Sequence, residues 1–122
     1  FGPKTWNLVG IDGDERAVLA GQAQGLPLQK VSLEESKFEE ISFGLIFLIM
    51  TIEQVSNPKV LLRSVYQKLK PGGKLVVVTN NTRTTSSYFF QGRHWGGYDF
   101  PRRNYLFNEA NLVKLVEAVG LK

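Results

Sequence analysis

The run FGLIFLIM at Phe43–Met50 decides the fold class of this 122-residue chain. It is apolar at nearly every position, which is typical of a central parallel strand buried on both faces. The run KLVVVT at Lys74–Thr79 predicts a second buried strand. Between the two runs, Asn57 is a suitable N-cap and Pro58 suits the first turn of a helix. A strand, a helix and a strand in series predict parallel strands joined by a right-handed crossover.

Shorter elements on either side continue this alternation. Asp14 and Asn108 are suitable N-caps, whereas Gly25, Gly120 and the run Pro71–Gly73 are suited to end helices. The alternation predicts an α/β domain. The expected elements are strands at 7–12 and 26–33, helices at 14–25, 57–70 and 108–120, and a loop or short helix at 34–40.

The composition is that of a soluble globular protein, with 43% apolar and 21% charged residues. The absence of cysteine excludes a disulfide scaffold, a thiolate metal site and a cysteine nucleophile, and it fits a cytoplasmic location. The formal charge of +4 is a mild excess without a nucleic-acid-binding motif, so we expect no nucleic-acid partner. The longest uncharged apolar run, 41–52, is too short to span a bilayer, so we expect no membrane partner.

Ligands of parallel sheets bind outside the carboxyl ends of the strands, so the residues that follow each predicted strand form the candidate site. Asp12 either accepts hydrogen bonds from both hydroxyls of a ribose or helps to cap the next helix. Ser32 either meets a base edge or lies in a solvated loop. Glu53 and Gln54 either line a cleft or cap the helix that follows them. Asn80 either hydrogen-bonds a substrate or builds a turn.

The stretch at about 80–106 is long, polar and rich in aromatic and arginine side chains. Connections of this length are usually functional, and we expect a lid-like loop with basic residues at its rim. The same side chains are also suited to stacking on bases or gripping an anion. His94 is the single histidine, too few for a metal site, so no metal is predicted. Neither a nucleophile elbow nor a phosphate-loop motif occurs, and the catalytic residues stay unknown.

Four runs, in this order and spacing, resemble one known family. They are NLVGID at 7–12, FGLIFLIMTIEQVSNPKVLL at 43–62, VYQKLKPGGKLVVVTNN at 65–81 and GRHWGGYDFPRRNYLFNEANLVKLVEAVGL at 92–121. Together they look like the central and later part of a class I S-adenosylmethionine-dependent methyltransferase, in the small-molecule branch (types 11, 12 and 23).

This resemblance implies a Rossmann-like three-layer sandwich with a mostly parallel sheet, S-adenosylmethionine as cofactor, and methyl transfer to a small-molecule acceptor. Asp12 matches the acid that binds the ribose hydroxyls, and Ser32 and Leu33 fall where the family contacts adenine. By position, the implied cofactor contacts are Asp12, Gly13, Ser32, Leu33 and Glu53. The implied acceptor contacts are Gln54, Asn80, Trp95, Arg102 and Tyr105.

The sequence departs from the family at four positions and by one absence. Ser32 and Gly44 each replace an acid, and Gln54 and Arg103 each replace a histidine. The Gly-rich loop D-x-G-x-G-x-G, which cradles the methionine end of the cofactor, does not occur before Asn7. We therefore expect this chain to be part of a longer protein, or another copy or chain to complete its sheet.

Two other functions remain open. The missing loop, Gly44 and Gln54 favour a non-catalytic remnant of the fold that serves as an interaction module. A nucleotide-sugar or NAD-binding enzyme of another family ranks last, because the chain has no G-x-G-x-x-G turn.

Overall fold

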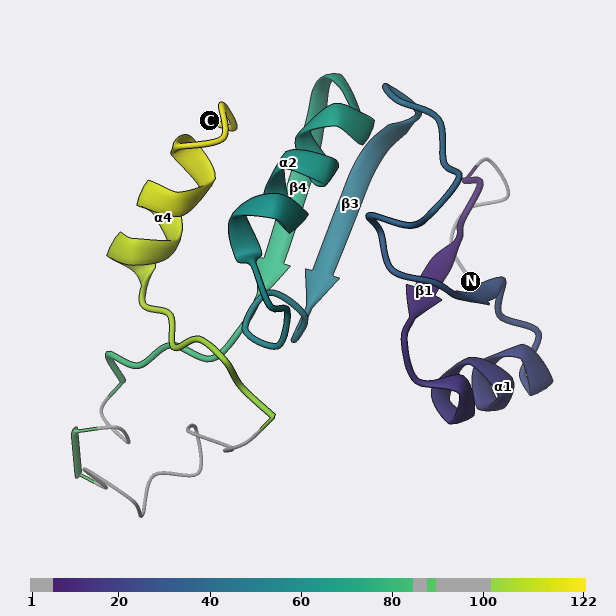
Figure 1. Cartoon of the computed structure of the whole chain (residues 1–122), viewed down its shortest axis with the longest axis horizontal. Coiled ribbons are helices and arrows are strands. Elements are labelled where there is room, and N and C mark those ends of the chain that lie inside the picture. Colours follow the sequence, from purple (N-terminus) through teal and green to yellow (C-terminus); the bar gives the residue numbers. More distant parts are fainter. Residues whose placement is uncertain (1–5, 85–87, 90–101) are drawn as a thin grey trace. The chain divides into compact units, whose positions relative to one another are not determined.

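The computed structural model describes residues 6–84, 88–89 and 102–122, which form a mixed α/β architecture (Figure 1). Two compact units divide the chain, Phe1–Lys37 and Phe38–Lys122, called here the first and second units. Each unit contains one two-stranded parallel sheet. The predicted α/β class and its parallel strand pairing are therefore confirmed.

The first unit is a small strand–helix–strand motif. Its elements are β1 (Gly10–Asp12), α1 (Glu15–Ala23) and β2 (Leu28–Lys30). As predicted, Asp14 caps α1 by accepting a hydrogen bond from the Arg16 N–H, and Gly25 follows the helix with φ +80°. Gly10 and Gly21 leave the space that the Leu28 side chain occupies, because a Cβ at either position would collide with it.

Both strands of the first unit are shorter than predicted. The predicted ranges 7–12 and 26–33 pair over three residues only, from Gly10↔Leu28 to Asp12↔Lys30. An apolar run forms a strand only where a partner strand supplies the hydrogen bonds. Here the partner supplies them only at these three register positions. The buried residues of α1 are Val18 and Gly21.

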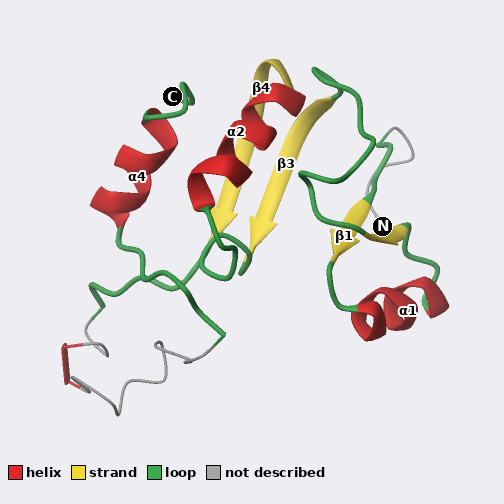
Figure 2. Ribbon diagram, in the orientation of Figure 1, coloured by secondary structure: helices red, strands yellow, loops and turns green. Residues whose placement is uncertain are grey.

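The second unit places one helix along a longer strand pair (Figure 2). Its elements are β3 (Phe43–Ile49), α2 (Pro58–Lys68), β4 (Leu69–Val78) and α4 (Glu109–Glu117). Asn57 caps α2 as predicted, accepting from the N–H groups of Lys59 and Val60. Asn108 caps α4 as predicted, in a reciprocal capping box with Asn111.

β4 begins five residues earlier than predicted, at Leu69 rather than at Lys74. The predicted stop at Pro71–Gly73 therefore lies inside this strand. The register passes from Phe43↔Leu69 to Leu45↔Lys74, so β4 carries extra residues in a bulge. Gly72 makes the bulge possible with φ +76°.

The core of the second unit lies on one face of the β3–β4 pair. Leu48, Leu62 and Val65 are at most 6% exposed. On the other face, Phe47 and Ile49 are 54% and 62% exposed, and their register partners Val76 and Val78 are 37% and 46% exposed. The prediction that Phe43–Met50 is buried on both faces is therefore wrong for the described chain, because elements cover only one face.

Ile41 offers a test of local strain in the second unit. Its φ is +54°, a left-handed conformation that is rare for a β-branched residue, and its side chain is 58% exposed. We expect Ile41→Gly to raise the free energy of unfolding by about 1 kcal/mol in a urea titration, because released strain exceeds the entropy cost of glycine. Ile49→Gly is the matched control, since Ile49 is similarly exposed in a regular strand. It should lower the free energy of unfolding, and a fall for both variants would contradict the strain assignment.

Candidate functional site

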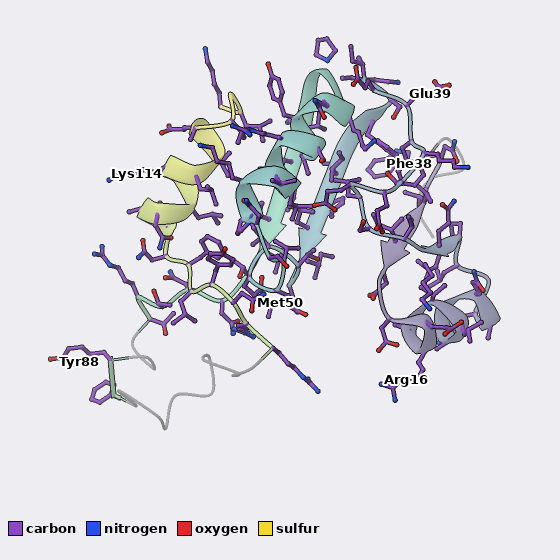
Figure 3. All side chains as sticks on the ribbon, viewed as in Figure 1. Arg16, Phe38, Glu39, Met50, Tyr88 and Lys114 are labelled. Atoms are coloured by element: carbon purple, nitrogen blue, oxygen red, sulfur yellow. The ribbon has the colours of Figure 1, made fainter. Side chains whose placement is uncertain are left out.

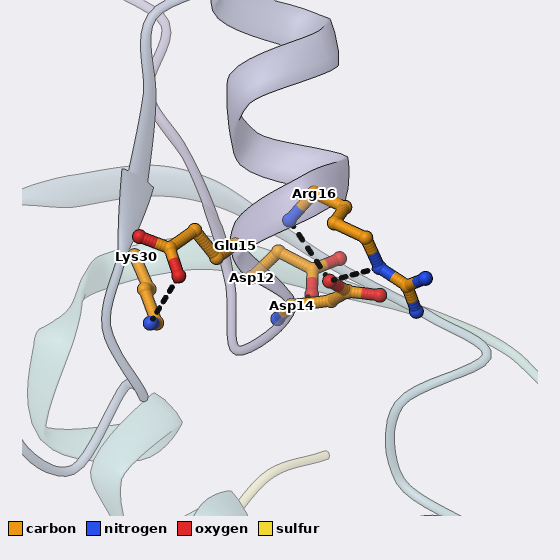
Figure 4. A network of polar contacts seen from close by, with 5 residues as sticks. All are labelled: Asp12, Asp14, Glu15, Arg16 and Lys30. Atoms are coloured by element: carbon orange, nitrogen blue, oxygen red, sulfur yellow. Dashed lines mark hydrogen bonds and ion pairs between the residues drawn. The ribbon is translucent and has the colours of Figure 1, made fainter.

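In the first unit, Asp12 stands at the carboxyl end of β1 in a cluster of charged side chains (Figure 4). Its Oδ1 accepts from the Asp14 N–H at 2.7 Å, which fixes the turn into α1. Asp14 is itself the cap and pairs with Arg16, and Glu15 pairs with Lys30 at 3.2 Å. Asp12 is exposed, and a carboxylate that makes one hydrogen bond keeps further acceptor capacity. Asp12 therefore orders the turn and can still accept further hydrogen bonds with its carboxylate oxygens.

The other candidate residues in the first unit differ in how exposed they are and in whether their polar groups are already hydrogen-bonded. Gly13 is exposed, and a Cβ there would meet nothing within 4 Å, so the backbone is open to approach. The Ser32 hydroxyl donates to Glu35 Oε2 at 2.9 Å and accepts from the Glu35 N–H at 3.3 Å, which builds a local turn. Leu33 is buried at 8% exposure.

In the second unit, Glu53 is the buried charged residue among the described positions. It is 1% exposed, and its Oε2 accepts from the Thr79 hydroxyl at 2.9 Å. Within the described part of the chain, its buried Oε1 has no hydrogen-bond partner. Because an unpaired buried carboxylate oxygen costs free energy, this atom is a candidate acceptor for a donor group on a ligand.

The turn before Glu53 has an unusual backbone. Met50 directly follows β3 (Figure 3). Its φ is +50°, and its N–H donates to the Val78 carbonyl at 2.8 Å. The Gln54 Nε2 donates to the Met50 carbonyl at 2.6 Å, so the Gln54 side chain folds back on this turn. Strained backbone is typical of functional sites, and here it lies where β3 ends.

The start and the return of the 80–106 stretch meet beside these residues. Asn81 forms a parallel bridge with Phe107, and the Thr82 N–H donates to the Phe107 carbonyl at 2.8 Å. The Asn80 side-chain oxygen, with the amide oriented to satisfy its neighbours, accepts from the Arg103 guanidinium. The stretch thus leaves and rejoins the second unit at one place.

The remaining residues that the sequence predicts to contact the methyl acceptor lie where the 80–106 stretch returns, or within the stretch itself. The Tyr105 hydroxyl donates to the Ser56 carbonyl at 2.8 Å, and its ring stacks on Phe107 with centroids 6.3 Å apart. Arg102 is exposed. Trp95 and His94 lie outside the described residues. The second unit therefore brings Glu53, Gln54, Asn80 and Tyr105 to one end of its strands.

An open pocket of about 330 Å³ lies next to the return, at the start of α2. Its wall is largely apolar, and the amide side chains in it are engaged in capping α2 and α4. The lining residues are Asn57, Pro58, Lys59, Tyr105, Leu106, Phe107, Asn111 and Leu115.

Three residues contact the predicted site residues but are not themselves among the predicted cofactor or acceptor contacts. They are Thr79, Arg103 and Asn104. Thr79 has a signal in the sequence, because it is the last residue of a predicted strand. Asn104 has none, since its partners lie about fifty residues earlier in the chain.

In the ranges that the structure describes, no helix is long and apolar enough to cross a membrane. The same ranges contain no group of three or more His, Asp and Glu side chains placed to hold a metal ion.

Comparisons with known structures find the same fold. An S-adenosylmethionine-dependent methyltransferase from Thermotoga maritima superposes with a TM-score of 0.78 at 22% identity, over 91% of this chain and 53% of the other. For a second one, from Archaeoglobus fulgidus, the TM-score is 0.72 at 18% identity, over 92% and 49%. Phosphoethanolamine N-methyltransferase 2 of Haemonchus contortus, in complex with S-adenosylmethionine, gives 0.61 at 22%, over 92% and 27%.

The chain spans about half the length of the first two of these structures. Among curated proteins, no sequence matches it. The family model described as a methyltransferase domain matches residues 1–122, the whole of the chain. The chain therefore belongs to the methyltransferase domain family.

Proposed function

We propose that this chain is part of a domain that transfers a methyl group from S-adenosylmethionine to a small-molecule acceptor. The observation that carries the proposal is the Asp12 carboxylate, which lies on the last residue of a parallel strand, makes one hydrogen bond and stays exposed. An acid at this position is suited to the two hydroxyls of a ribose.

The residues present fit the nucleoside part of the cofactor. Asp12 would accept from the ribose hydroxyls, and the open backbone at Gly13 would allow close approach. Ser32 and Leu33, two to three residues beyond the register pair Asp12↔Lys30, would contact the adenine. In the second unit, the unpaired Oε1 of Glu53 would accept from a donor group of the cofactor.

When bound, S-adenosylmethionine supplies a methyl group on a sulfonium, a good leaving group. The protein then has to bind the cofactor and the acceptor, orient them and exclude water. Correct placement of the two molecules alone can supply much of the rate. We propose that Gln54, Asn80, Trp95, Arg102 and Tyr105 orient the acceptor. Gln54 is not required to act as a general base. Its side-chain amide donates a hydrogen bond to the Met50 carbonyl.

A small-molecule acceptor is supported by one of the similar structures, which is named for phosphoethanolamine. The exposed guanidinium of Arg102 is suited to an anionic group on such a molecule. We further propose a lid-like role for the stretch at about 80–106 and a cytoplasmic location, supported by the absence of cysteine.

We also propose that the chain works as part of a larger methyltransferase domain. Its length is about half that of similar structures, and Phe47 and Ile49 leave one sheet face exposed. Residues of the same protein outside this chain, another copy or another chain would complete the sheet.

Calorimetric titration with S-adenosylhomocysteine tests the proposal, because this product occupies the cofactor site without an acceptor. We expect micromolar binding, and no binding of homocysteine as the control ligand. If the chain does not bind, the same titration is made on the longest protein that its gene encodes. Failure there too would overturn the methyltransferase proposal and favour the interaction module.

A further inference from the structure

Two adjacent residues, Asn104 and Tyr105, satisfy four successive carbonyl groups of the turn before α2. The N–H groups of Asn104 and Tyr105 donate to the Glu53 carbonyl at 2.8 and 3.1 Å. The Asn104 Nδ2 donates to the carbonyls of Gln54 and Val55 at 2.8 and 3.4 Å. The Tyr105 hydroxyl donates to the Ser56 carbonyl at 2.8 Å. We call this set of contacts the 104–105 clamp.

The clamp is the long-range support of a turn that has little local support. Within the turn, the Gln54 N–H donates to the Thr51 carbonyl, and the Gln54 side chain returns to Met50. The carbonyls of 53–56 precede the first turn of α2, and among the described residues no helical N–H donates to them. Backbone carbonyls without partners are costly, so loss of the clamp would free this turn to move.

The clamp also fixes the place from which the Glu53 side chain extends. The Glu53 carbonyl is held by two N–H groups, and its Oε2 by Thr79 at the end of β4. Held at both points, the carboxylate keeps its Oε1 unpaired among the described residues. A donor group of a ligand would thus meet an acceptor that is already in place, which lowers the ordering cost of binding.

We propose that Asn104 is a positioning residue, which holds the Glu53–Ser56 turn so that the Glu53 carboxylate is set for a donor group of the ligand. This proposal rests on the proposed function, in which Glu53 contacts the cofactor. Asn104 acts through the backbone of the turn and touches no ligand itself. Its two side-chain hydrogen bonds are what distinguish it from any other polar residue at that position.

The test combines amide hydrogen exchange with S-adenosylhomocysteine titration on Asn104→Ala. We expect the Gln54 and Tyr105 amides to exchange about tenfold faster, as the loss of two neutral hydrogen bonds implies, while β3 and β4 amides keep their rates. The dissociation constant should rise by a similar factor. Asn104→Asp keeps the size but removes the donor, and it should behave as Asn104→Ala does.

Gln67→Ala is the matched control, because it deletes an exposed amide side chain of α2 in the same unit. Unchanged exchange at Gln54 and Tyr105 in Asn104→Ala would overturn the clamp. Faster exchange with unchanged affinity would overturn the positioning role and leave a purely structural one. A wild-type chain that does not bind the ligand, even in its longest form, would count against the proposed function, and the exchange rates would still decide the clamp.

Discussion

Leu62→Ala is expected to lower the free energy of unfolding of the second unit by about 2–5 kcal/mol, the usual cost of a large-to-small change in a core. Leu62 is 0% exposed and lies in the middle of α2, whose buried residues also include Leu61 and Val65. A small unit has few such residues, so neighbouring side chains cannot close the resulting cavity. The loss is a large part of the stability of a typical domain.

Hydrogen exchange of β3 and β4 amides measures this loss, because these amides report on opening of the second unit alone. Val60→Ala is the control, since Val60 lies two residues earlier in the same helix and is 43% exposed. Its effect should stay within about 0.5 kcal/mol. Equal effects of the two variants would mean that the core of this unit is not where the structure places it.

The helix starts could be predicted from the sequence because their chemistry is local. Asp14, Asn57 and Asn108 each accept a hydrogen bond from an N–H two or three residues later, so a short window of sequence contains the whole interaction. Gly25 likewise follows its helix with a positive φ.

The bounds of the strands could not be predicted as well, because they depend on partners elsewhere in the chain. From its local sequence, Pro71–Gly73 is predicted to end a helix. The pairing of Leu69 with Phe43 instead places these residues within β4. An apolar run such as Phe43–Met50 shows that a strand can be buried on both faces. It does not show whether elements of the same chain cover both.

The candidate site was predictable at single positions and not in its connections. That Glu53 follows a buried strand is visible in the sequence, but its burial and its unpaired oxygen are not. The 104–105 clamp and the contact between Asn80 and Arg103 join segments separated by more than twenty residues. No local pattern contains both partners of such contacts.

Asp12→Asn is expected to weaken S-adenosylhomocysteine binding by about 5- to 150-fold, the equivalent of about 1–3 kcal/mol for lost hydrogen bonds to a carboxylate. Asparagine still offers an oxygen to the Asp14 N–H, so the turn into α1 is kept. What it loses is the second carboxylate oxygen, and with it the pairing with two ribose hydroxyls. Calorimetric titration of the two proteins under the same conditions measures the difference.

Asp14→Asn separates this contact from a general effect of charge. It removes one negative charge from the same turn, and asparagine caps a helix about as well as aspartate does. Binding should therefore stay close to that of the wild type. If Asp14→Asn weakened binding as much as Asp12→Asn, the local field and not a ribose contact would account for the loss. If neither variant weakened binding, Asp12 would be only a turn residue, and the assignment of the nucleoside to the first unit would fail.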